Sequence, residues 1–176
     1  LPVLLLTLFP TAVSVSPAVC EEITLVDFGR TTTAEWRLDS DRFVTATGGR
    51  LEIGSFEGDR RVLGAEMEFT PSAGPAYYML LPNKEFKTEG DLRLKGLKMT
   101  VRGYGCRLKT AVLAEDSQGI RYEFFLGTLN FTGWRVLQYS APRFGLRYRP
   151  MKDVIFRGLV FYSGEPEPLF PSTRRI

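Results

Sequence analysis

The first notable feature of this 176-residue sequence is that it contains no histidine. Without an imidazole there is no Ser-His-Asp or Cys-His nucleophile system, no histidine general base and no histidine ligand for zinc. Cysteine is scarce too, and the two cysteines present cannot form a four-thiolate metal site. Catalysis by these histidine-dependent and metal-dependent routes is therefore excluded, which makes an enzyme less favoured, and we expect no cofactor.

Neither sign of charge is in large excess. The chain has 23 Lys and Arg against 20 Asp and Glu, a net charge of +3. This excess is too small to indicate a nucleic-acid partner. Basic residues gather only between Arg143 and Arg175, which predicts either a solvated surface or a patch that docks on an acidic or repeating partner. We expect no nucleic acid and no small-molecule substrate.

Charged residues are absent from residues 1–20. A short apolar block from Leu4 to Phe9 precedes small residues up to Cys20, which is the order of a secretory signal. The apolar block is too short to span a membrane, and three prolines argue against a spanning helix. We predict a signal segment over residues 1–20 and no membrane span; a lipid anchor on Cys20 and a buried N-terminal segment of the fold are the alternatives. After export Cys106 stands alone, and we expect a buried small side chain.

A sustained helical period is also lacking, and apolar and polar residues alternate with a period of two instead. In the run 92–104, for example, Leu97, Met99 and Val101 fall on one face. The run 154–162 is apolar on both faces apart from Arg157, which predicts a central strand. The expected strands are 23–28, 51–53, 62–69, 77–81, 92–104, 108–114, 120–126, 134–139 and 154–162.

Clusters of Gly, Pro and Asp separate these runs, as is typical of turns. Nine or ten strands at this spacing predict an all-β protein. Specifically, we expect an antiparallel β-sandwich over residues 21–162, of the jelly-roll kind seen in galactose-binding and carbohydrate-binding modules. The Pro-rich residues 163–176 are predicted to run over the surface as a tail.

Carboxylate pairs and aromatic residues carry the remaining chemistry. Glu66 and Glu68 have the groups for glycoside hydrolysis, but their alternation with apolar residues favours the wet face of a strand. Asp39 and Asp41 offer oxygen ligands for calcium, yet a turn accounts for them equally well. Aromatic residues make up 12% of the chain and either fill the core or stack on a partner. Those beside Arg or Gln, such as Trp134, are the better interface candidates.

One segment is distinctive, the run Gly127-Thr128-Leu129-Asn130-Phe131-Thr132-Gly133-Trp134. Ala141-Pro142-Arg143, Arg147-Tyr148-Arg149-Pro150 and a further strand at 155–159 follow it. Together they resemble the flagellar filament outer layer (sheath) proteins of spirochaetes. In that family a strand ends in Gly-x-Leu-x-Phe-x-Gly-Trp, and a Pro-containing loop and a basic stretch with Tyr and Pro come next. The resemblance covers most of residues 23–162 and is most detailed over 95–160.

The resemblance implies a non-enzymatic subunit that is exported to the periplasm. There it would coat the flagellin core of a periplasmic flagellum and affect filament stiffness, curvature and motility, with flagellin and other sheath subunits as partners. The alternative is an exported carbohydrate-binding β-sandwich module. The family signature and assembly interface are expected at Gly127, Leu129, Phe131, Gly133, Trp134, Arg135, Tyr139, Pro142, Arg143, Arg147, Tyr148 and Arg149.

The sequence departs from the family in one place. Longer members continue past the strand at 154–162 with a turn and a final strand, whereas here a Pro-rich segment follows. An absent final strand is expected to leave an open sheet edge that a partner strand can fill.

Overall fold

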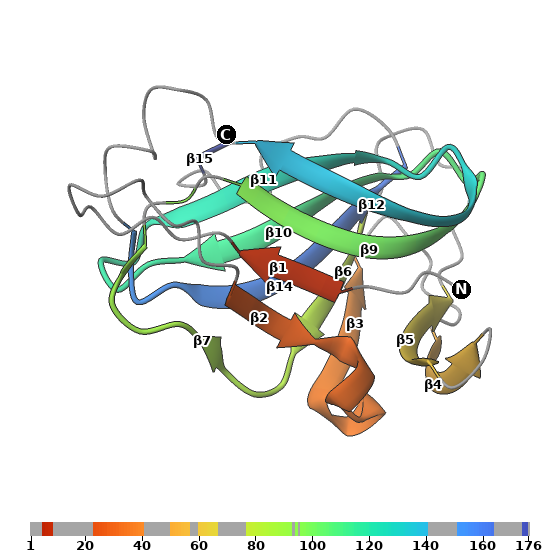
Figure 1. Cartoon of the computed structure of the whole chain (residues 1–176), viewed down its shortest axis with the longest axis horizontal. Coiled ribbons are helices and arrows are strands. Elements are labelled where there is room, and N and C mark those ends of the chain that lie inside the picture. Colours follow the sequence, from red (N-terminus) through yellow and green to blue (C-terminus); the bar gives the residue numbers. More distant parts are fainter. Residues whose placement is uncertain are drawn as a thin grey trace, which may run out of the picture.

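The structure is a computed structural model that describes residues 5–8, 23–40, 50–56, 60–66, 77–92, 94, 96–140, 151–163 and 174–175. Within these residues nearly all regular structure is β-strand, and the only helices are two single turns of 3-10 helix. Two large sheets face each other, with further small strands beside them (Figure 1). The all-β prediction is confirmed.

The elements divide into the two large sheets and several short pairs. Their bounds in chain order are β1 (Leu5–Leu8), β2 (Ile23–Asp27), η1 (Phe28–Arg30), η2 (Thr33–Glu35), β3 (Trp36–Ser40), β4 (Arg50–Phe56), β5 (Arg60–Glu66), β6 (Tyr77–Pro82), β7 (Phe86–Lys87), β8 (Asp91–Leu92), β9 (Gly96–Tyr104), β10 (Lys109–Glu115), β11 (Arg121–Thr128), β12 (Thr132–Ser140), β13 (Met151–Lys152), β14 (Ile155–Tyr162) and β15 (Arg174–Arg175).

One sheet has the order β15-β11-β10-β14-β6-β3, with β7 also paired to β14, and the other has the order β12-β9-β1-β2. The chain crosses from the four-stranded sheet to the seven-stranded sheet after β9. It makes the β10–β11 hairpin there, and crosses back to place β12 beside β9. All pairs are antiparallel except β11 with β15. The β9–β12 pair is therefore formed by strands that are not consecutive in the sequence.

Strand β14 is central, as its apolar character predicted. It pairs with β10 on one side and with β6 and β7 on the other. Phe156, Leu159 and Phe161 face the main core, while Val160 and Tyr162 belong to a second apolar cluster on the opposite face. Over Gly158–Tyr162 both faces of this strand are removed from water, which explains why its sequence is apolar apart from the exposed Arg157.

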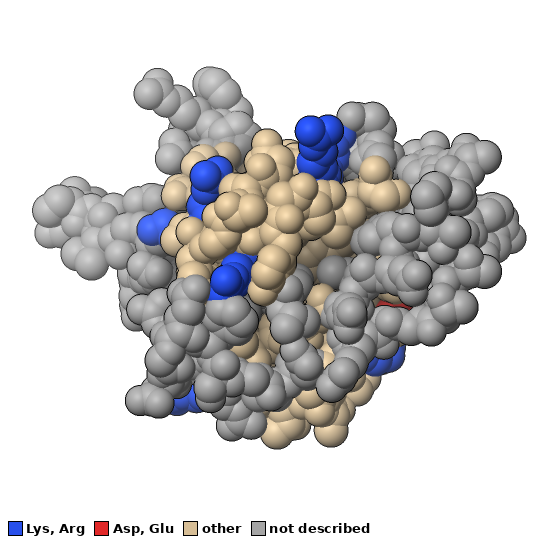
Figure 2. Space-filling model, turned by 90° about the vertical axis from the view of Figure 1, so that its right-hand side faces the viewer, with Lys and Arg blue, Asp and Glu red and all other residues tan. Residues whose placement is uncertain are grey.

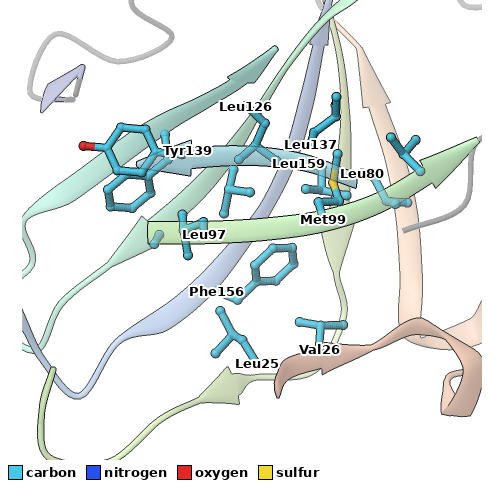
Figure 3. Packing of buried hydrophobic residues seen from close by; sticks show 14 of the residues in the cluster. Leu25, Val26, Leu80, Leu97, Met99, Leu126, Leu137, Tyr139, Phe156 and Leu159 are labelled. Carbon is cyan, nitrogen blue, oxygen red and sulfur yellow. The ribbon is translucent and has the colours of Figure 1, made fainter. Parts of the chain in front are cut away.

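The main core lies between the two sheets. Leu97 and Met99 from β9 meet Leu126 and Phe156 of the opposite sheet in one cluster of buried side chains (Figure 3). At one side of this cluster, Trp36 stacks with Phe28 and Phe86 at centroid distances of 4.9 and 5.4 Å. The aromatic content of the sequence is accordingly used largely to fill the core.

The N-terminal strand lies in the segment predicted as a secretory signal. Leu5–Leu8 pairs with β9 on one side and β2 on the other, and is the link between those two strands. This pairing corresponds to the alternative of an N-terminal segment within the fold. It does not test whether the segment is removed on export, so the signal stays a prediction.

Some boundaries differ from those expected. The run 92–104 is split, because Asp91–Leu92 pairs with β13 whereas β9 begins at Gly96. Strand β3 had no predicted counterpart, since its sequence Trp-Arg-Leu-Asp-Ser contains three polar residues and is only five residues long. The expectation for Cys106 was wrong: its side chain is exposed in the turn after β9.

Candidate interaction surface

The distinctive Gly-x-Leu-x-Phe-x-Gly-Trp segment is the crossover from β11 to β12. Gly127 and Gly133 have positive φ angles of 142° and 84°, which side chains rarely adopt. Leu129 and Phe131 are buried, 1% and 8% exposed. The signature therefore has a structural cause, because two glycines allow the chain to turn and two apolar side chains close the end of the core.

A second connection lies beside this crossover. The turn between β9 and β10 is hydrogen-bonded to it: the Gly105 amide donates to the Phe131 carbonyl (2.8 Å), and the Arg107 amide donates to the Leu129 carbonyl (3.0 Å). A side chain on Gly103 would come within 2.5 Å of the Phe131 carbonyl oxygen. The two connections form one tightly built end of the molecule, and this end fixes β12 next to β9.

The outward face of the β9–β12 pair is the surface that follows from this arrangement. Side chains of Leu97, Met99 and Leu137 point into the core, so alternate residues point away from it. We call this surface the β9–β12 outer face. It consists of Lys98, Thr100, Arg102 and Tyr104 from β9 and of Thr132, Trp134, Val136, Gln138 and Ser140 from β12.

Two exposed apolar side chains lie on this face. Val136 is 54% exposed and Tyr104 is 47% exposed, two of the three large hydrophobic residues exposed in the described structure. Trp134 is half-buried, and its register partner is Arg102. Exposed apolar and aromatic groups on a sheet face are typical of a contact surface for another macromolecule.

The same end of the molecule is basic. Arg102 lies 5.5 Å from the Tyr104 ring centroid, and Arg135 lies 4.4 Å from that of Phe131, both as cation–π contacts. Residues 96–114 and 124–140 contain five Lys or Arg and no Asp or Glu. Figure 2 looks at this end, where blue groups are spread over the described surface and red is scarcely visible. The surface is suited to an acidic partner.

Apart from Tyr139, the residues predicted for the assembly interface fall into three groups. Trp134 and Arg135 lie where a partner can contact them. Gly127, Leu129, Phe131 and Gly133 build the crossover instead. Pro142, Arg143, Arg147, Tyr148 and Arg149 lie outside the described residues.

Tyr139 is placed differently from its expected contact role. Its ring packs on Phe124 in the core at 5.2 Å, and the residue is 8% exposed. Its hydroxyl group has no hydrogen-bond partner among the described residues, and burial raises the pKa of Tyr139. The structure therefore gives Tyr139 a packing position, because residues 137 and 139 share the inward face of β12.

Several residues of the surface were missed in the sequence. Tyr104, Arg107 and Val136 were not among the expected contacts, although the alternation in residues 97–102 had already placed Lys98 and Arg102 on one face. What the pattern could not reveal is that this face continues onto β12. The two crossovers determine that β12 is the neighbour of β9, and no sequence pattern within the crossovers indicates this pairing.

The carboxylate of Asp116 has a structural role. Asp116 caps its turn: one oxygen accepts from the Gln118 and Ile120 amides at 3.0 Å, and the other accepts from the Tyr122 hydroxyl at 2.8 Å. Among the described residues, no group of three or more acidic or cysteine side chains is arranged to hold a metal ion. Asp39 lies in a strand rather than in the turn that was considered, and Asp41 is outside the described residues.

A hollow of about 490 Å³ lies on the outer face of the seven-stranded sheet. Met79, Leu81 and Leu113 give it apolar walls, and Asp39, Glu115 and Arg157 are polar parts of its lining. Glu115 accepts from Arg157 (3.0 Å) and from Arg121 (3.1 Å). The hydrogen bond from Arg157 is the main cause that lowers the pKa of Glu115, with Arg121 adding to it and burial opposing both.

The fold defines an all-β protein, and one face of its four-stranded sheet is basic and carries exposed apolar side chains. A family model described as "Flagellar filament outer layer protein" (FlaA) matches residues 42–156, well over half of the chain. The chain belongs to the flagellar filament outer layer protein family, and the resemblance found in its sequence is confirmed.

A curated relative carries the same description. The flagellar filament outer layer protein of Borreliella burgdorferi is 37% identical over 62 residues, which are 34% of this chain and 18% of that protein. The matched part is thus less than a fifth of the relative's length. No solved structure matches the chain. Within the described residues, no helix is long and apolar enough to cross a membrane.

Proposed function

We propose that the protein is a structural subunit of the layer that coats the flagellin core of a periplasmic flagellum. The observation that carries this proposal is the family match over residues 42–156, supported by a relative of the same description. The subunit contributes to the stiffness and curvature of the filament, and through them to motility. It acts by assembly with flagellin and with other sheath subunits, without catalysis.

The physical properties of the chain support this role. Two sheets packed around an aromatic-rich core make a rigid unit, which suits a repeating layer. The nested order of β9 to β12 across the two sheets is the basis for proposing a jelly-roll sandwich. Trp134 and Arg135, with the basic stretch 143–149, are the proposed contact residues, because Trp and Arg are enriched in binding hot spots.

Export by the signal at residues 1–20 is part of the proposal. Cleavage near residue 20 takes β1 out of the four-stranded sheet, because Leu5–Leu8 lies within the leader. Strand β9 would then lack its partner on that side and β2 would lose its link to β9. The mature subunit therefore has to close this gap by moving β2 or by accepting another strand.

Fractionation of the source cell tests the sheath role. Periplasmic filaments are purified and their proteins identified by mass spectrometry, with the N-terminus of the chain determined in the same experiment. The expected result is stoichiometric amounts of the chain in the filaments, beginning near residue 21. Chain found only in the soluble periplasm, beside clean filaments, contradicts the sheath role.

A carbohydrate-binding module is the second candidate, and the hollow of about 490 Å³ favours it. Ligand sites commonly have volumes of ~300–1,000 Å³ with apolar walls and a few polar groups. The two functions differ in a simple assay. A module binds a soluble glycan with saturation and loses it when Arg157 is changed to Ala, whereas a sheath subunit binds none.

A further inference from the structure

The free edge of β12 is the feature that the family assignment leaves unexplained. Strand β12 is paired with β9 along all nine of its residues, with no shift of register. No strand of the described structure pairs with its other side. Figure 1 shows β12 at the margin of the four-stranded sheet, on the side of β9 opposite to β1 and β2.

The strands that lie at the other edges of the two large sheets are short, although β15 pairs with only two residues of β11. Strands β2 and β3 have five residues each and β15 has two, whereas β12 has nine. Proteins usually protect a long edge with Pro, Lys or a bulge, because an unpaired strand adds strands from other molecules. Between Thr132 and Ser140 there is no Pro and no Lys, and the one charged residue is Arg135.

The side chains of β12 suit strand addition. Thr132, Val136, Gln138 and Ser140 are exposed and uncharged, and a β-branched residue lies at the centre of the strand. In strand addition the main chain of the edge supplies hydrogen bonds to an extended segment, and side chains beside it supply selectivity. The edge of β12 provides both parts.

Charge identifies the kind of segment that fits. Arg107 is exposed in the turn between β9 and β10, where its amide donates to the Leu129 carbonyl of the crossover that leads into β12, and Arg135 is exposed on β12 itself. Residues 96–114 and 124–140, among which Arg107 and Arg135 lie, contain no carboxylate. Attraction to an acidic segment is favoured. A second copy of the chain, paired edge to edge, brings no carboxylate from these strands.

We infer that the edge of β12 binds an extended acidic segment of the flagellar filament by β-strand addition, with Arg107 and Arg135 selecting the acidic side chains. This inference rests on the proposed sheath function for the identity of the partner. The mode of binding rests on β12 alone.

The test compares a double charge reversal, Arg107→Glu with Arg135→Glu, with a matched control, Lys87→Glu with Lys152→Glu. All four side chains are exposed, and each pair changes the net charge equally. The control residues lie on β7 and β13, away from β12. Unchanged thermal unfolding midpoints establish that both variants are folded.

Two probes are used with the full chain. One is filament cores stripped of their outer layer, in a co-sedimentation assay. The other is a synthetic nine-residue peptide of alternating Val and Glu, with a Val–Lys peptide for comparison. We expect the reversal to weaken binding of both by about tenfold or more, and the control to change it by less than about twofold. Hydrogen exchange is expected to slow along Thr132–Ser140 when the acidic peptide binds.

The outcomes separate the two proposals. Binding to cores that is insensitive to the reversal, without slower exchange in β12, overturns the strand-addition inference and leaves the sheath role standing. Peptide binding with slower exchange in β12, but no binding to cores, supports the edge as an acidic-strand site and contradicts the sheath role. Equal binding of the Val–Lys peptide overturns the role of charge.

Discussion

The two large sheets have outer faces of opposite character. At the centre of the seven-stranded sheet, the outward residues Ala111 and Val160 are 0% exposed and Tyr162 is 2% exposed. On the four-stranded sheet the outward Val136 and Tyr104 are about half exposed. The first face contributes to the stability of the fold, whereas the second is available for contact. Outward side chains therefore have different roles in the two sheets: buried ones stabilise the fold, and exposed ones are accessible to a partner.

Charges differ between the two faces in the same way. On the seven-stranded sheet, Glu115 is held between Arg121 and Arg157, and Glu123 accepts a hydrogen bond from Tyr162. The β9–β12 outer face has cations and no carboxylate. Opposite charges that are paired stabilise a folded surface, whereas an excess of one sign attracts a partner of the other sign. The following predictions test this difference.

The same substitution on both faces gives the largest contrast. Tyr162→Ala removes a buried ring that contacts Tyr77, and we expect a loss of about 3–5 kcal/mol in the free energy of unfolding. Tyr104→Ala removes a half-exposed ring and is expected to cost about 0.5 kcal/mol or less. Denaturant unfolding of both variants measures the difference. Similar losses at the two positions would contradict it.

On the inner side of the four-stranded sheet, a substitution that adds volume should destabilise the protein as it does in a hydrophobic core. Gly103→Ala places a methyl group within 2.5 Å of the Phe131 carbonyl oxygen and against its ring, so we expect a loss of about 1–3 kcal/mol. Gly119→Ala is the control, because it has a positive φ but no atom within 4 Å. The stability that Gly119→Ala loses reflects backbone strain alone and is expected to be about 1 kcal/mol. Equal losses of stability in the two variants would contradict the expectation that close packing at the crossover adds to the cost at Gly103.

Removal of the Tyr162 hydroxyl group tests how much a buried hydrogen bond contributes to the stability of the seven-stranded sheet. Tyr162→Phe keeps the ring but deletes the hydrogen bond to the buried Glu123 carboxylate. The expected loss is about 1–2 kcal/mol, because a buried acceptor loses its donor. Tyr104→Phe, at the exposed face, should leave the unfolding midpoint unchanged. A neutral Tyr162→Phe would indicate that water replaces the hydroxyl group.

The smallest expected effect concerns pH. Hydrogen bonds from Arg157 lower the pKa of Glu115, so the folded state favours the carboxylate. This stabilisation is complete above the ordinary glutamate pKa of about 4.3 and is lost as the pH falls through the lower folded value. Because both arginines are about half exposed, the contribution is below about 1 kcal/mol.

Arg157→Ala tests whether Glu115 contributes to the pH dependence of stability. The variant is expected to lose less stability than the unmodified protein between pH 5 and pH 3, measured by urea unfolding. Lys87→Ala is the matched control, because it removes an exposed positive charge on β7 and not one that is bonded to Glu115. Identical acid dependence in the unmodified protein and in Arg157→Ala would rule out Glu115 as a contributor.

Much of the architecture was predictable from alternation along the chain. The period-two pattern assigned Leu97, Met99 and Val101 to one buried face, and it identified the strand at 154–162 as central; both are confirmed. Strands β3, β7 and β13 escaped prediction because five or two residues without a clear alternation carry too little pattern. Of the expected contact residues, Trp134 lies on the β9–β12 outer face and Arg135 is exposed on the same strand, whereas Tyr139 is in the core.

The sequence by itself determined the class of fold, the inward residues of the long strands and membership of the family, since each depends on local order along the chain. The tertiary structure decided which strands are neighbours and which outward faces are covered. Strand β12 lies beside β9 because two crossovers enclose the β10–β11 hairpin. Alternation shows which side chains share a face, but not whether water, another part of the chain or a partner covers it.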